Sequence, residues 1–195
     1  MKSTGKKLLL SALIFAVPVL AQAHPGHDGH DLTWSFSTGF GHPLSGWDHL
    51  RAMIAVGLWA AMLGGRARWL VPLAFIGTMA IGAACGRVGL ALPGIEQGIA
   101  ASLFILGLLI AFTVRLPLVI CMGLVGIFAL FHGWAHGAEM GMRTRGFAYG
   151  GGFVFATALL HAAGLLLGLL VKKQTLIPRI TGGVIAAAGV LALAI

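Results

Sequence analysis

Long apolar runs separated by short clusters of glycine, proline and charge make up most of the chain. Each run is close to or above the roughly 20 residues that an α-helix needs to cross a bilayer. The apolar positions are continuous, whereas strands of a membrane β-barrel alternate apolar and polar residues over about ten positions. The pattern predicts an all-α polytopic membrane protein with a bundle of six transmembrane helices, at residues 44–64, 69–90, 97–114, 116–137, 147–171 and 176–195.

The first 23 residues have the three parts of a secretory signal peptide. Three lysines precede the run LLLSALIFAVPVL, and Ala-Gln-Ala follows it. The run is shorter than a bilayer span, so we expect cleavage after Ala23, with a retained signal anchor as the alternative. The predicted organisation is a signal peptide at 1–23, a His/Asp-rich periplasmic segment at 24–41 and a six-helix membrane domain at 42–195.

Composition excludes other classes of protein. The chain is 58% hydrophobic and only 9% charged, whereas soluble domains carry about a quarter charged residues. The net charge of +8 does not indicate nucleic-acid binding, because the basic residues are scattered singly or in pairs and form no basic face. The partner that this composition implies is the lipid bilayer. Small-residue spacings in the spans indicate close helix packing. The sequence is compatible with either a monomer or a homo-oligomer.

The distribution of charge predicts the orientation. Cytoplasmic loops of membrane proteins are enriched in Lys and Arg. With the mature N-terminus in the periplasm, three basic residues fall outside (Arg87, Arg143, Arg145) and six fall inside: Arg66, Arg68, Arg115, Lys172, Lys173 and Arg179. We therefore expect a protein of the bacterial inner membrane with a periplasmic mature N-terminus.

Ionisable side chains begin the first predicted span. They are His42, Asp48, His49 and Arg51, in the stretch GHPLSGWDHLRAM. Ionisable groups cost roughly 2.5 to 3.5 kcal/mol at the centre of a membrane helix, so those present are paired, hydrated or functional. Pro43 suits the first turn of a helix, which would place His42 at its cap and Asp48 about two turns inside. On one continuous helix His42 and His49 would differ by only 20°.

A second group, His132, His136 and Glu139 in FHGWAHGAEM, closes the fourth predicted span. These three residues lie within a 60° stripe if the helix continues through Gly137. The topology brings both groups to the outer membrane face. Imidazoles with one or two carboxylates suit Ni²⁺, Co²⁺, Zn²⁺ or Cu²⁺, so the two groups predict a divalent transition-metal site. The alternative is that each histidine makes ordinary hydrogen bonds between helices.

Several other residues could handle the same ion. His24, His27 and His30 form a metal-collecting tail or a solvated linker. Glu96, in the outer loop between the second and third spans, is a ligand or a loop charge. His161 would lie about 21 Å into the fifth span, where it serves an exit step or packs within the bundle.

The two motifs resemble those of the HupE/UreJ family of nickel permeases. HPLSGWDHLRAMIAVG at 42–57 is similar to the family element HPxxGxDHxxxMxxVG, and FHGWAHGAE at 131–139 is similar to its second His-rich element. The resemblance covers nearly the whole mature chain. It implies a six-span permease that moves Ni²⁺ inward, with no permanently bound cofactor, and motif positions at His42, Asp48, His49, His132, His136 and Glu139.

The resemblance also implies functional roles for Phe75 and Glu96, which occupy positions similar to a functional Phe and Glu of that family. Some members are assigned to cobalt, and the residues do not separate the two ions because neighbouring divalent metals favour similar ligands. Two alternatives to transport remain: a membrane zinc metalloenzyme acting at the outer face, and a non-transporting metal-binding accessory protein. No HExxH motif occurs, so we expect no enzyme.

Overall fold

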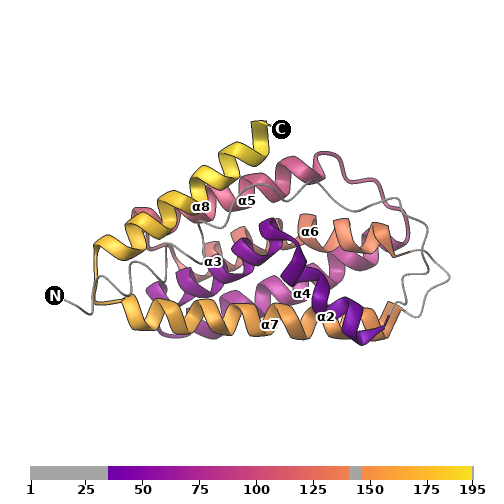
Figure 1. Cartoon of the computed structure of the whole chain (residues 1–195), viewed down its shortest axis with the longest axis horizontal. Coiled ribbons are helices and arrows are strands. Elements are labelled where there is room, and N and C mark those ends of the chain that lie inside the picture. The colour runs from indigo at the N-terminus through magenta and orange to yellow at the C-terminus, as the bar shows by residue number, and fades with distance from the viewer. Residues whose placement is uncertain (1–34, 141–145, 195) are drawn as a thin grey trace.

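The computed structural model describes residues 35–140 and 146–194, and every regular element in these residues is an α-helix. The predicted signal peptide and most of the predicted periplasmic segment fall outside the described residues. Seven helices are described (Figure 1): α2 (Phe36–Ser45), α3 (Trp47–Leu63), α4 (Ala67–Arg87), α5 (Ile95–Ala111), α6 (Leu118–Glu139), α7 (Gly146–Val171) and α8 (Leu176–Ala194).

The start of the first predicted span is divided between two helices. Ser35 caps α2 through a capping box with Thr38, and α2 ends where Gly46 adopts an extended conformation. The prediction that His42 caps the helix and Asp48 lies two turns inside is therefore wrong. His42 lies in the last turn of α2, whereas Asp48 lies in the first turn of α3. The 20° relationship between His42 and His49 does not apply either, because no continuous helix joins them.

Helix α3 lies in the middle of the bundle (Figure 1) and has almost no exposed face. Twelve of its 17 residues are buried, and the Trp59 indole donates a hydrogen bond to the carbonyl of Val114. It packs on α7 along one side and also contacts α4 and α5. A helix that is apolar all round and covered by its neighbours is typical of the core of a helical membrane protein.

Two further helix pairs, α4 with α6 and α5 with α8, complete the bundle. Glycines allow the α4–α6 pair to approach until backbones touch. A Cβ at Gly82 or Gly86 of α4 would collide with the α6 backbone, and one at Gly133 or Gly137 of α6 with the α4 backbone. The predicted role of these small-residue spacings in close helix packing is confirmed.

The helices α4, α6, α7 and α8 are each long and apolar enough to cross a membrane. Helices α3 and α5 have 17 residues each and fall just below that length. All six lie where the sequence predicts a span, and no end is displaced by more than about three residues. The structure thus supports a helical membrane protein, while the six crossings remain a prediction.

Candidate metal centre

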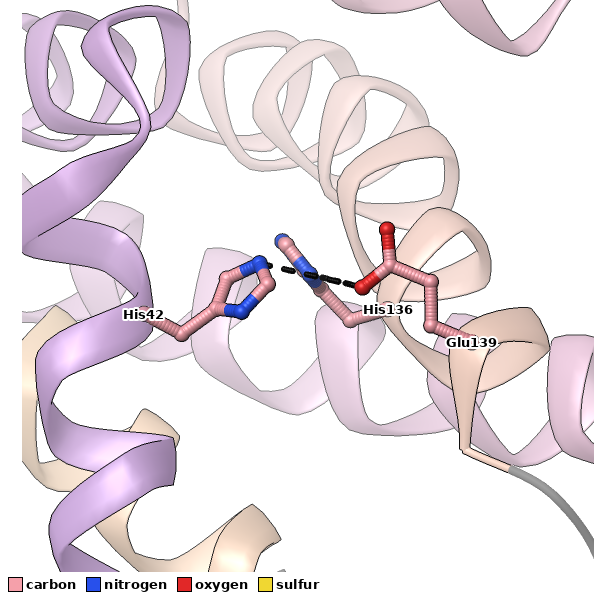
Figure 2. Close-up of side chains that lie close together, drawn as sticks. All are labelled: His42, His136 and Glu139. Carbon is pink, nitrogen blue, oxygen red and sulfur yellow. Dashed lines mark ion pairs between the residues drawn. The ribbon is translucent and has the colours of Figure 1, made fainter. Parts of the chain in front are cut away.

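An imidazole of α2 meets an imidazole and a carboxylate of α6. Figure 2 shows His42 projecting from α2 towards His136 and Glu139. One potential ligand atom from each of the three lies within 4.8 Å of the others. The Nε2 of His42 is 3.8 Å from the Glu139 carboxylate, and the Nδ1 of His136 is 3.9 Å from the same oxygen. Two nitrogen and oxygen donors at about 2.1 Å from a common ion lie at most about 4.2 Å apart, so small movements would close this cluster around a cation.

The three side chains of this cluster differ strongly in solvent exposure. The Glu139 side chain is 43% exposed and that of His42 34%, whereas that of His136 is only 4% exposed. We call these three residues the outer site. An ion reaching it from water would meet the carboxylate first and the buried imidazole last.

The local sequence explains how the outer site forms. Pro43 lies inside α2 and is buried, and the chain turns at Gly46 directly after this helix. Helix α6 continues through Gly137 to Glu139, which meets the condition set in the sequence analysis, so His132, His136 and Glu139 project from one side of it. His132 and His136 are both buried.

Two aromatic residues of α7 form a wall of the site that the sequence analysis missed. The Phe153 ring lies 4.3 Å from the His136 ring between centroids, and Tyr149 lies 6.0 Å from His42. Helix α7 packs along both α2 and α3. One signal was present in the sequence, because Tyr149 is the single tyrosine of the chain.

Behind the outer site the imidazoles continue into the bundle. His49 of α3 lies 4.4 Å from His136 and 4.8 Å from His132, measured between ring centroids. His49 is 5% exposed and His132 is fully buried. The two predicted groups therefore meet, although the break at Gly46 means that His42 and His49 reach α6 from different helices.

Phe75 separates this row from the histidine of α7. Its ring is fully buried and lies 5.8 Å from His132 and 5.1 Å from His161 between centroids. His161 is also buried, and neither of its ring nitrogens has a hydrogen-bond partner among the described residues. Successive ring contacts therefore form one row, which runs from the outer site into the bundle in the order His42, His136, His49, His132, Phe75 and His161.

The other predicted residues lie at the starts of helices or outside the described residues. Asp48 is partly exposed in the first turn of α3, and Glu96 is exposed in the first turn of α5. The prediction that Glu96 lies in a loop is therefore wrong by one helix boundary. His24, His27 and His30 fall outside the described residues, so the predicted metal-collecting tail stays a prediction.

Comparison with known proteins places the chain. Residues 11–192 match the family described as HupE / UreJ protein. The chain belongs to the HupE/UreJ family. It is also 42% identical over 186 residues to Protein HupE of Rhizobium leguminosarum bv. viciae, an alignment covering 94% of this chain and 95% of the relative. No solved structure matches the chain.

Membership of the HupE/UreJ family bears on the chemistry of the outer site. The family is associated with uptake of nickel or cobalt or with an accessory function, and it is not known for enzymes. The resemblance predicted from the two motifs is confirmed. This association with metal handling agrees with the nitrogen and oxygen donors that the outer site offers.

Proposed function

We propose that this protein carries a divalent transition-metal ion, first of all Ni²⁺, from the periplasm to the cytoplasm across the bacterial inner membrane. The observation that carries the proposal is the row of imidazoles, which runs from the half-exposed His42 to the fully buried His132. A structural site would need only one closed set of ligands, whereas transport needs ligands that exchange along a path.

The outer site would bind the ion by exchange of water for ligands. His42, His136 and Glu139 offer two nitrogen donors and one oxygen donor, a set that suits Ni²⁺ and Co²⁺. The carboxylate supplies negative charge where a cation must shed water, which offsets part of the lost hydration. The imidazoles then offer neutral donors further inward.

Movement beyond His132 would require passage of Phe75. The ring separates His132 from His161, so we propose that a change in its position opens the route to His161. His161 would then receive the ion on the cytoplasmic side of this barrier. Asp48, Glu96 and the segment with His24, His27 and His30 would act before or around the outer site.

The deciding experiment measures metal movement by the purified full chain in sealed proteoliposomes. Ni²⁺, Co²⁺, Zn²⁺ and Cu²⁺ are supplied at equal low concentration, with His136→Ala as the inactive comparison. We expect Ni²⁺ or Co²⁺ to accumulate at least tenfold faster than in empty vesicles. Binding without accumulation would instead favour a non-transporting accessory protein, and the carrier proposal would fail.

A further inference from the structure

Ser102 of α5 makes a buried contact with one of the imidazoles. Its Oγ lies 3.0 Å from the Nε2 of His132, and both residues are fully buried. Ser102 belongs to neither histidine motif and lies on α5, the helix that precedes α6. It is also the single polar side chain in the stretch from Gly98 to Phe112.

The hydroxyl of Ser102 has one hydrogen, and a second contact determines where that hydrogen points. The Oγ is 2.6 Å from the carbonyl oxygen of Ile99, a distance at which Ser102 must donate. A carbonyl oxygen can only accept, so the hydrogen is committed to it. The Ser102 oxygen is then an acceptor towards His132.

This assignment fixes the tautomer of His132. If Ser102 accepts, the Nε2 of His132 must carry the hydrogen and donate it. A neutral imidazole has one protonated nitrogen, so the lone pair lies on Nδ1. That nitrogen is buried and has no hydrogen-bond partner in the part of the chain that the structure describes.

A buried acceptor without a donor costs free energy and calls for an explanation. The His132 ring lies beside the ring of His49, at 4.8 Å and an angle of 90°, and on the way to Phe75. We propose that the Nδ1 of His132 and the imidazole of His49 form a second, inner metal site, and that Ser102 is the positioning residue that holds His132 in its ligating tautomer. This inference rests on the proposed transport function and adds a site to its path.

The arrangement has a chemical precedent in general metal-site design. A histidine ligand usually donates its second ring N–H to a fixed acceptor, which sets the tautomer and the ring orientation. Ser102 supplies such an acceptor, and its own bond to Ile99 prevents it from reversing roles. The inner site would be neutral, since no carboxylate takes part, and it would therefore hold the ion less tightly than the outer site.

The first test reads the tautomer directly. The full chain is labelled with ¹⁵N in its imidazoles, and the His132 signals are identified as those missing in His132→Asn. We expect a neutral ring protonated at Nε2, and in Ser102→Ala a mixture of both tautomers. Zn²⁺, used as a diamagnetic probe, should shift the Nδ1 signal in the wild-type chain. A ring protonated at Nδ1, or an Nδ1 signal that Zn²⁺ leaves in place, would overturn the proposal.

The second test measures Ni²⁺ uptake in proteoliposomes. Ser102→Ala should lower the maximal rate about tenfold and leave KM within twofold, because the outer site is intact. The matched control is Thr181→Val, which removes a buried hydroxyl from a different helix, α8, and should change neither value. A maximal rate in Ser102→Ala equal to that of the control would overturn the proposal. Absence of uptake by the wild-type chain would defeat the transport function, whereas the Zn²⁺ titration would still decide the inner site.

Discussion

The Nε2 of His42 lies 3.8 Å from a carboxylate oxygen of Glu139, although the two residues belong to α2 and α6, which are far apart in the sequence. An ion between them would tie α2 to the end of α6, so each of these side chains should matter for binding. We expect His42→Ala and Glu139→Gln to lower the initial rate of uptake at low Ni²⁺ at least tenfold, in line with the loss of a metal ligand or its close support.

The control for these variants is Phe147→Ala. Phe147 begins α7 at the same end of the bundle and is 94% exposed, so its removal should leave uptake unchanged. The amount of protein in the membrane is measured for each variant. Wild-type uptake by both His42→Ala and Glu139→Gln would contradict a role for the outer site.

A kinetic distinction should separate the two ends of the row. His161 packs on the side of Phe75 away from His132, so in the proposed path it would act after the ion has bound at the outer site. We expect His161→Asn to lower the maximal rate several-fold without raising KM, whereas His42→Ala should raise KM. Saturation curves in proteoliposomes measure both values, and a raised KM alone in His161→Asn would place this residue outside the proposed path.

Acid should weaken binding. An imidazole ionises near pH 6.5, and the protonated ring has lost its lone pair for a metal. Between pH 7 and pH 5 the neutral fraction of a histidine with this ordinary pKa falls about 25-fold, so affinity for Ni²⁺ should fall by at least that factor. Equilibrium dialysis of the purified chain across this range gives the dissociation constants. A constant affinity would contradict ligation by a solvent-accessible imidazole such as that of His42.

The close contact of α4 and α6 predicts a difference between two glycines of the same helix. A Cβ at Gly133 would collide with the backbone of Met79, whereas one at Gly123 would meet nothing within 4 Å. Gly133→Ala should destabilise the fold by about 1 to 3 kcal/mol, as overpacking does. Gly123→Ala should be neutral or stabilising, because alanine favours a helix by up to about 1 kcal/mol.

Thermal unfolding in detergent, followed by the loss of monodisperse protein, compares these two variants. The expected order of midpoints is Gly133→Ala below wild type, with Gly123→Ala equal to or above it. If both substitutions lowered the unfolding midpoint equally, the backbone contact at Gly133 would not explain the loss of stability.

The helices could be predicted closely from the sequence because bilayer-length apolar runs have few other solutions. The two histidine motifs could be brought to one end by the parity of crossings, and their rings do meet. The break at Gly46 could not be derived, because Pro43 is compatible with both a first helical turn and a helix interior near its end. That choice depends on tertiary packing, here the burial of Pro43.

Ser102 and the aromatic wall escaped prediction for a different reason. Each belongs to a helix without an ionisable motif of its own near the site, and its role appears only when α5 and α7 pack on the histidines. Periodicity indicates which face of a helix is apolar, but not which neighbour covers it. A lone hydroxyl in an apolar run is nevertheless a signal worth following.

The enclosed position of α3 bears on how the protein is made. This helix leaves the ribosome long before α7, which covers it and also packs on α2. A nascent chain that ends before residue 146 already contains His42, His49, His136 and Glu139, yet it lacks the scaffold that aligns them. Assembly of a competent binding path must therefore wait until synthesis has passed the fifth of the long hydrophobic segments, and His161, at the inner end of the row, is supplied by that same late helix.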